Sequence, residues 1–426
     1  VTMTKFVVQG GTPLKGVVTA SGAKNAILPM LAASVMATSP CVFHNAPHLS
    51  DVNTMLRILK GMGAKVERGG KDGSSLYVDP SSIDSYVVDE MLMRQVRSSI
   101  FLMGPLLGKM KKAQVSYPGG CDIGQRPIDL HLKGLKALGA QFVEAHGQIL
   151  AECADWTGTD IHLDIPSVGA TENIMMGACL AEGVTVIRNA AKEPEIVDLQ
   201  GFLNAMGAKV RGAGTDVVRI EGVGALNGAN YTVMPDRIEV GTLMIAAAMT
   251  RGNVLISNGV IEHVQAAVAK LREVGALVTV NGEGVRVRGV QHIRPTDLKT
   301  LPYPGFPTDM QPQMMALLSI ADGTSVITET IFDSRLKQAE ELGRMGARIR
   351  TEGRTAIIKG VQKLSGAHVE ATDLRSGASL VIAGLAAEGR TVIGGIRNVD
   401  RGYERLELKL TSLGASVTRV VSEHTD

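Results

Sequence analysis

The stretch ATENIMMGACLAEGVTVIRNAAKEPEIVDLQGFLNAMGAKV, residues 170–210, contains one copy of the pattern that decides the fold. Its apolar first part predicts a helix that ends at Gly183, because glycine tolerates the positive φ of a helix C-terminus. The β-branched residues that follow predict a strand. Leu199, Phe202 and Met206 then recur at helical spacing, which is typical of one face of an amphipathic helix. The stretch therefore predicts a helix, a strand and a second helix in succession.

The same pattern recurs along the whole chain. Each copy ends its amphipathic helix with a Gly-Ala dipeptide, and successive dipeptides lie at a nearly constant spacing. Their glycines are Gly63, Gly139, Gly207, Gly275, Gly346 and Gly414. A constant period of this kind indicates an internal repeat. Since every copy combines strands with two helices, six copies predict an α/β architecture.

The first helix of each copy is apolar on nearly all sides. Leu243–Met249, Met314–Ile320 and Leu380–Ala387 carry almost no charge, and such a helix belongs in an interior. Six interior helices are too many for one core, so we expect two domains of three copies each, with the sheets outside. The expected domains are residues 22–232, and residues 1–21 together with 233–426. The alternative is one long sheet wound from six similar units.

The start of each interior helix carries or adjoins a polar or charged residue. Counting back by the same number of positions from the residue that ends each helix leads to this set: Lys24, Asn25, Arg97, Ser98, Gly169, Arg237, Ile238, Thr308, Asp309 and Arg375. A helix N-terminus presents unpaired N–H groups and a partial positive charge. If the three helices of a domain run parallel, two such domains enclose a cleft suited to a polyanionic ligand. The alternative is that these residues are ordinary caps and surface charges.

Composition excludes several classes of protein. The chain has 426 residues, a net charge of +2 and 3% aromatic residues, which disfavours nucleic-acid binding. No apolar stretch approaches a membrane span, and the first residues lack a signal pattern. The four cysteines and nine histidines show no metal-binding spacing. We therefore expect a cytoplasmic protein without a metal, a cofactor, a membrane contact or an obligate protein partner.

The second copy contains an insertion. Its segment between strand and Gly-Ala is the longest of the six, and it includes YPGGCDIGQRP, residues 117–127. Three glycines and two prolines in this segment predict a mobile lid. Arg126 favours a thiolate at Cys121, whereas Asp122 opposes it, so Cys121 is either a nucleophile or a protonated acid. Cys41, Cys153 and Cys179 are predicted to be small core residues.

Three further segments each connect a strand to a helix. Residues 303–309 lead into a helix start, where Asp309 in a cationic neighbourhood would be ionised and able to accept a proton from a bound hydroxyl. Residues 332–335 and 400–405 also follow strands and open helices. We expect all three segments at the rim of the same cleft.

Several motifs in these segments occur together across nearly the whole chain. They are SGAKNA (21–26), PGGC (118–121), RPIDLH (126–131), SVGAT (167–171), PDRIE (235–239), PGFPTDMQ (304–311), DLR (373–375) and DRGYER (400–405). In combination they resemble the enolpyruvyl transferase family. The resemblance implies two inside-out α/β barrel domains of three repeats each, with the active site in the cleft between them.

The resemblance also implies an activity. The motifs fit best the branch of the family that transfers the enolpyruvyl group of phosphoenolpyruvate to the 3′-hydroxyl of UDP-N-acetylglucosamine and releases phosphate, by addition and then elimination. This reaction is the first committed step of peptidoglycan synthesis. The expected partners are these two small molecules. Two alternatives are an enzyme that acts on 3-phosphoshikimate, whose branch lacks the Pro-Gly-Gly-Cys lid, and a non-catalytic paralogue that binds UDP-sugars.

Roles for single residues follow from the resemblance alone. The catalytic residues would be Cys121, Asp309, Lys24 and Arg401, with Cys121 as the acid that protonates the methylene carbon, or as the site of a phospholactoyl adduct and of alkylation by fosfomycin. The phosphoenolpyruvate site would contain Lys24, Asn25, Arg126, Arg335, Arg375 and Arg401. The UDP-sugar site would contain Asn25, Arg97, Arg126, Pro127, Ile128, Asp129, Leu130, Ser167, Val168, Gly169, Thr308, Asp309 and Ile331. Two departures from some relatives are Ile165-Pro166 before the Ser-Val-Gly turn and Asp122 after the cysteine.

Overall fold

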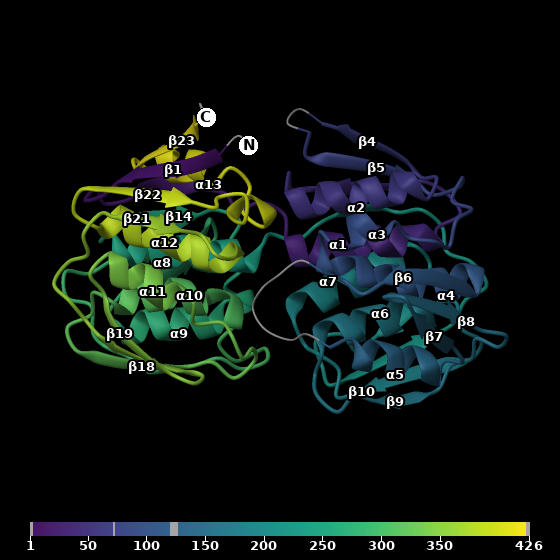
Figure 1. Cartoon of the computed structure of the whole chain (residues 1–426). Coiled ribbons are helices and arrows are strands. Elements are labelled where there is room, and N and C mark those ends of the chain that lie inside the picture. Colours follow the sequence, from purple (N-terminus) through teal and green to yellow (C-terminus); the bar gives the residue numbers. More distant parts are fainter. Residues whose placement is uncertain (1–2, 71–72, 120–126, 423–426) are drawn as a thin grey trace. The chain divides into compact units, whose positions relative to one another are not determined.

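The computed structural model describes residues 3–70, 73–119 and 127–422. These residues divide into two compact units (Figure 1). Residues 22–119 and 127–234 form the N-terminal unit, and residues 3–21 and 235–422 form the C-terminal unit. Each unit has a hydrophobic core of its own.

Each unit is built around three interior helices. In the N-terminal unit they are α1 (Lys24–Ala33), α4 (Met103–Met110) and α6 (Val168–Ala178). In the C-terminal unit they are α8 (Arg237–Met249), α10 (Gln311–Leu318) and α12 (Leu374–Ala386), and these three pack against one another. Every residue of α8 is buried. The apolar helices are therefore interior, as their composition predicts.

Amphipathic helices form the second helical set. They are α2 (Ser50–Gly61), α5 (Asp129–Ala137), α7 (Pro194–Ala205), α9 (Gln265–Glu273), α11 (Gln338–Arg344) and α13 (Leu406–Ser412). The glycine of the Gly-Ala dipeptide that follows each of them has a positive φ, between 91° and 115°. The glycine surplus thus has a conformational cause, because a side chain at these helix ends would be strained. Short helical turns are η1 (Ser34–Met36), α3 (Glu90–Met93), η2 (Arg97–Leu102), η3 (Ile261–His263), η4 (Thr308–Met310) and η5 (Val399–Arg401).

Among the described residues, the strands form six separate sheets. In four of them an edge strand runs parallel to its neighbour, which pairs antiparallel with a hairpin. A fifth has the same strand order, but two strands from opposite ends of the chain take the place of the hairpin, and the sixth has three strands. The N-terminal unit contains the sheets β13(Asn230–Thr232)-β3(Cys41–His44)-β5(Ser75–Asp79)-β4(Lys65–Gly69), β6(Lys112–Ser116)-β8(Gln148–Glu152)-β7(Gln141–Ala145) and β9(Asp160–His162)-β10(Val184–Arg188)-β12(Val217–Glu221)-β11(Lys209–Arg211). The C-terminal unit contains β2(Lys15–Val18)-β14(Asn253–Ile256)-β16(Gly284–Arg288)-β15(Leu277–Asn281), β17(Leu298–Lys299)-β18(Thr324–Thr328)-β20(Thr355–Lys359)-β19(Arg348–Glu352) and β21(His368–Glu370)-β22(Arg390–Gly394)-β1(Met3–Gln9)-β23(Ser416–Ser422).

The alternative of one continuous sheet is wrong. In the third, fifth and sixth copies the interior helix connects an edge strand to the parallel neighbour of that strand, and none of the six sheets continues into another. In the second copy a single parallel bridge, Val87 to Gln114, stands where the other sheets have an edge strand. Two edge strands are exchanged where the chain passes between the units. β13 pairs with β3 in the N-terminal unit, and β2 pairs with β14 in the C-terminal unit.

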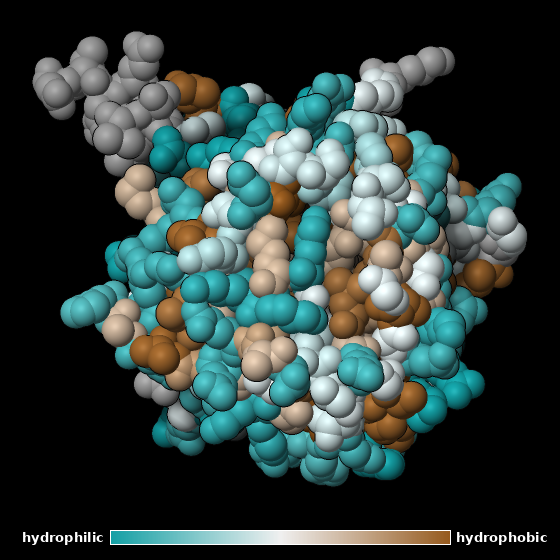
Figure 2. Space-filling view, turned by 90° about the vertical axis from the view of Figure 1, so that its right-hand side faces the viewer, coloured by the Kyte–Doolittle hydropathy of each residue, from teal (hydrophilic) through white to brown (hydrophobic). Residues whose placement is uncertain are grey.

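The surface is mixed in character. Figure 2 shows a largely hydrophilic face on which hydrophobic residues lie in scattered groups. Within the described part of the chain, no helix is both long enough and apolar enough to cross a membrane.

Candidate active site

The interior helices begin where the repeat predicts. The observed starts are Lys24 (α1), Arg97 (η2, which continues into α4), Val168 (α6), Arg237 (α8), Thr308 (η4, which continues into α10) and Leu374 (α12). Each lies next to its predicted position. The set of polar residues selected from the sequence is therefore found at helix starts.

In the C-terminal unit these helix starts lie together. The side-chain Nε2 of Gln313, in the first turn of α10, donates to Thr242 Oγ1 in α8 at 3.0 Å. The guanidinium of Arg375, at the start of α12, reaches the carboxylate of Asp309 in η4. The convergence of helix N-termini expected from the sequence is thus confirmed within this unit.

Asp309 lies between two arginines. Its Oδ1 accepts from Arg335 Nη2 at 2.8 Å, and its Oδ2 accepts from Arg375 Nη2 at 3.0 Å. The two arginine side chains are 4% and 3% exposed, whereas that of Asp309 is 26% exposed. Burial raises the pKa of the Asp309 carboxyl, but the charges and hydrogen bonds of both arginines lower it by more, so the pKa lies well below its ordinary value. Asp309 is therefore an ionised carboxylate, and its side chain is partly exposed.

The guanidinium of each arginine lies over an aromatic ring, and for Arg335 this is the ring of Phe332. The guanidinium of Arg375 lies 5.2 Å from the ring centroid of Tyr403, whose hydroxyl contacts Thr242 and Gln313. Arg375 Nη1 and Arg335 Nε are buried and have no acceptor among the described residues. A pair of buried guanidiniums with N–H donors to spare is suited to a carboxylate or phosphate ligand.

Three more predicted site residues lie in the same unit. Thr308 Oγ1 accepts from Arg335 Nη1 at 3.1 Å and so belongs to the Asp309 cluster. Ile331 follows β18 and is 36% exposed. Arg401 ends η5, which packs on α12. At the next residue, Gly402, a Cβ would lie 2.6 Å from Leu374 Cδ2, so Arg401 is kept close to the start of α12.

In the N-terminal unit, Lys24 forms a buried ion pair. Its Nζ lies 2.6 Å from Asp51 Oδ2, and the two side chains are 12% and 6% exposed. A lysine at a helix start is opposed by the helix dipole, and Asp51 compensates that charge. The neighbouring Asn25 is exposed. Sequence reasoning missed Asp51, because the sequence shows an acidic residue near the start of α2 but not that it meets Lys24 of α1.

A second cluster joins α5, α6 and η2. Ser167 caps α6 by accepting from Ala170 N at 3.3 Å. At Gly169 a Cβ would lie 3.0 Å from the His131 ring, so a larger residue at this position would require the ring to shift. His131 Nδ1 is 3.1 Å from Asn173 Nδ2, which also donates to Ile100 O at 3.0 Å. The Ser167–Gly169 turn is thereby tied to the helical segment that starts at the half-buried Arg97.

The remaining predicted residues lie around the start of α5. Pro127 and Asp129 are exposed, whereas Ile128 and Leu130 are 5% and 9% exposed and pack into the core. Cys121 and Arg126 lie outside the described residues, as does most of the predicted lid. The other three cysteines are buried core residues, which confirms their predicted role.

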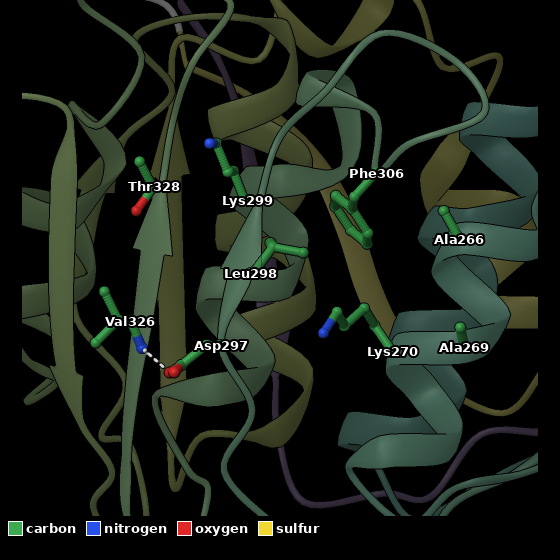
Figure 3. Close-up of a pocket in the computed structure, with 9 residues that line it drawn as sticks. All are labelled: Ala266, Ala269, Lys270, Asp297, Leu298, Lys299, Phe306, Val326 and Thr328. Carbon is green, nitrogen blue, oxygen red and sulfur yellow. Dashed lines mark hydrogen bonds between the residues drawn. The ribbon is translucent and has the colours of Figure 1, made fainter.

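A separate groove lies on the C-terminal unit. It has a volume of about 560 Å³ and is lined by Ala266, Ala269, Lys270, Asp297, Leu298, Lys299, Phe306, Val326 and Thr328 (Figure 3). None of the predicted site residues lines it. Among the described residues, no group of His, Cys, Asp and Glu side chains is placed to hold a metal ion.

Comparison with known proteins assigns the family. The model of the EPSP synthase (3-phosphoshikimate 1-carboxyvinyltransferase) family matches residues 8–410. The chain belongs to this family. It is a carboxyvinyltransferase, that is, an enolpyruvyl transferase, as the sequence motifs predict.

Members of the family with high identity share one description. The chain is 55% identical over 421 residues to UDP-N-acetylglucosamine 1-carboxyvinyltransferase 1 of Carboxydothermus hydrogenoformans, which covers 99% of each chain. It is 56% identical over 419 residues to the protein of the same description from Symbiobacterium thermophilum, covering 98% of this chain and 95% of that one.

Solved structures confirm the fold. The enolpyruvyl transferase NikO from Streptomyces tendae matches with a TM-score of 0.89 at 24% identity, covering 99% of this chain and 100% of that one. EPSP synthase from Acinetobacter baumannii matches with a TM-score of 0.74 at 20% identity, with the same coverage. The predicted architecture of two α/β domains of three repeats is therefore correct.

Proposed function

We propose that this carboxyvinyltransferase uses UDP-N-acetylglucosamine as its acceptor. It would transfer the enolpyruvyl group of phosphoenolpyruvate to the 3′-hydroxyl of the sugar and release phosphate, in the cytoplasm, as the first committed step of peptidoglycan synthesis. The support is the identity of 49% to 56% to relatives described as acting on this sugar, against 20% to EPSP synthase.

The observation that carries the chemistry is the Asp309 carboxylate between two buried arginines. Asp309 would accept the proton of the sugar hydroxyl while the hydroxyl oxygen forms a bond to C2 of phosphoenolpyruvate. An acid, for which we propose Cys121, would protonate the C3 methylene in the same addition. The Cys121 thiolate that this addition leaves would take a proton back from the resulting methyl group as phosphate departs, which restores the double bond, and the proton held by Asp309 would leave with the phosphate. This sequence balances atoms and charges without a redox step.

The two arginines would serve two purposes. Phosphoenolpyruvate brings a carboxylate and a phosphate, and guanidiniums bind both in bidentate fashion. When Arg335 and Arg375 turn part of their donors to the substrate, Asp309 loses some of the stabilisation that keeps its pKa low, and so becomes a better base. Arg335 and Arg375 would help at the carboxylate of phosphoenolpyruvate, whereas Lys24, Arg126 and Arg401 would hold its phosphate, and Asn25 would complete this site.

The proposed UDP-sugar contacts come mainly from the N-terminal unit. Arg97, the 126–130 segment and the Ser167–Gly169 turn would bind the nucleotide and sugar, with Thr308, Asp309 and Ile331 at the reacting end. The buried side chains of Ile128 and Leu130 indicate that these two residues would contribute main-chain groups.

The decisive test is phosphate release from phosphoenolpyruvate with two acceptors in parallel. We expect release with UDP-N-acetylglucosamine and none with shikimate 3-phosphate. Release with shikimate 3-phosphate alone would assign the other acceptor, and no release with either would contradict a catalytic role.

The role of Cys121 is tested separately. The thiol is the expected point of attack for the epoxide fosfomycin, so Cys121→Ser should abolish time-dependent inactivation by this compound. Cys41→Ser, at a buried core thiol, is the matched control and should stay sensitive. Unchanged inactivation of Cys121→Ser would refute the assignment.

A further inference from the structure

We propose that Glu329 is a positioning residue that sets the geometry of both Asp309 and Arg335. It is absent from every motif that led to the candidate site, and its side chain is 1% exposed. The inference rests on the proposed function, since its measured effect is on phosphate release.

Strand register brings Glu329 to the site. β17 and β18 are parallel with Lys299 opposite Thr328, and Figure 3 shows these two side chains on adjacent strands. The residues that follow the two strands, Thr300 and Glu329, therefore lie side by side. Thr300 N donates to Thr328 O at 3.0 Å, which fixes this register up to the point where the strands end.

The carboxylate is satisfied by four donors. Its Oε1 accepts from Thr300 Oγ1 at 2.8 Å, Ile331 N at 2.8 Å and Phe332 N at 3.2 Å. Its Oε2 accepts from Thr308 Oγ1 at 2.8 Å. A buried charge is tolerated only when it is paired or hydrogen-bonded in this way. All four groups donate to Glu329, and the two backbone N–H groups cannot accept, so the contacts use the acceptor capacity of both carboxylate oxygens.

The hydroxyl of Thr308 connects Glu329 to Arg335, which in turn contacts Asp309. A hydroxyl has one hydrogen, and that of Thr308 points to Glu329, so its lone pairs are left to accept. Arg335 Nη1 donates to it at 3.1 Å while Arg335 Nη2 donates to Asp309 at 2.8 Å. Glu329 therefore determines which way Thr308 faces, and Thr308 determines where the guanidinium lies relative to Asp309.

A second connection runs through the backbone. By accepting from two successive amides, Glu329 anchors the turn at Ile331 and Phe332. Arg335 comes shortly after this turn, and its guanidinium lies 5.2 Å from the Phe332 ring centroid. One carboxylate thus fixes the helix start that carries Asp309 and the loop that carries Arg335.

The test is Glu329→Gln, which keeps size and removes the charge. An amide replaces one acceptor oxygen by an N–H donor, so the hydroxyl of Thr308 can no longer donate at that position and must turn, which should shift Arg335. We expect kcat for phosphate release to fall about 10- to 100-fold and KM for phosphoenolpyruvate to rise, because small misplacements of catalytic groups cost about that much. Glu352→Gln, at a carboxylate 56% exposed on the same sheet, is the control and should leave kcat and KM unchanged.

A purely structural role makes a different prediction. In that case Glu329→Gln would lower the melting temperature but leave kcat per folded molecule within two-fold of the original, and this result would overturn the inference. Thr308→Val interrupts the same connection without touching Glu329. Thr308→Val should also lower kcat. The kcat of the double variant should equal that of the less active single variant, because both substitutions break the same connection.

Independent, multiplicative losses in the double variant would overturn the proposed connection. If Glu329→Gln does not fold, unchanged kcat in Thr308→Val overturns it as well. An unsubstituted enzyme that releases no phosphate would contradict the proposed function, whereas an active enzyme with a fully active Glu329→Gln variant would contradict only the role of Glu329.

Discussion

At the scale of single residues, the contact between Asp309 and its two arginines has a direct consequence for catalysis. Asp309→Asn removes the proposed base but leaves both guanidiniums in place. We expect kcat to fall about 10²- to 10⁴-fold, the usual contribution of general base catalysis, while phosphoenolpyruvate binds as tightly as before or more tightly. Phosphate release and calorimetric titration measure the two quantities. Asp322→Asn, at a carboxylate 62% exposed, is the control. Turnover of Asp309→Asn within ten-fold of the original would exclude Asp309 as the base.

A second residue makes stability depend on pH. Burial raises the pKa of Glu172 well above its ordinary value, and the nearby Glu195 and Glu193 add to this. The folded protein therefore keeps a proton that the unfolded chain releases above about pH 4.3, so this residue lowers stability progressively as pH rises above that value. Glu172→Gln has no such proton. The unfolding free energy of this variant minus that of the original protein should therefore increase between pH 5 and 7, by at most about 1.4 kcal/mol per pH unit.

Urea unfolding at several pH values measures this difference. Glu67→Gln, at an exposed carboxylate, should show a constant difference over the same range. A constant difference for Glu172→Gln as well would show that Glu172 ionises normally in the folded protein.

At the scale of elements, the sequence predicts the local features and misses the contacts between distant segments. Helix starts, helix ends and the interior position of the apolar helices follow from residue spacing within a single copy of the repeat, and all were predictable. The pairing of Lys24 with Asp51, and of Glu329 with Thr308, depends on how separate elements meet. Sequence spacing contains no information on that register, so these partners emerge only from the structure.

The repeat itself suggests a stabilising substitution in β22. Thr391 is fully buried, and its hydroxyl has no partner among the described residues. The equivalent position of the fourth copy, in β14, is Val254, which is also fully buried. Since an unpaired buried hydroxyl costs about 1–3 kcal/mol, Thr391→Val should raise the unfolding free energy by about 1 kcal/mol.

Chemical denaturation measures the change, and the third copy offers a replicate. Thr185 in β10 is likewise buried with an unpartnered hydroxyl, so Thr185→Val should behave in the same way. Thr418→Val, on the exposed side of β23, should stay within about 0.5 kcal/mol of zero. Equal effects at all three sites would show that the gain comes from the strand propensity of valine and not from removal of an unpaired hydroxyl.

At the scale of the whole molecule, each unit is completed by strands from the other half of the sequence. β13 completes the sheets of the unit that contains α1, α4 and α6, whereas β1 and β2 complete those of the unit that contains α8, α10 and α12. The sequence predicts that residues 1–21 belong to the second unit. It does not predict the pairing partners of β2 and β13. In other copies the edge strand comes just before the interior helix and pairs with the strand after that helix. Neither half of the sequence, cut at its midpoint, therefore contains a complete unit.

The two cores should nevertheless respond separately to damage. Leu31 in α1 and Leu380 in α12 are fully buried in different hydrophobic clusters. Truncation of either one to alanine should cost about 2–5 kcal/mol, from lost burial and the cavity left behind. Hydrogen exchange followed by mass spectrometry resolves where that cost falls. Leu380→Ala should speed exchange in α8, α10 and α12 and leave α1, α4 and α6 at their original rates, and Leu31→Ala should do the reverse. Faster exchange throughout both units in either variant would show that the two cores unfold as one.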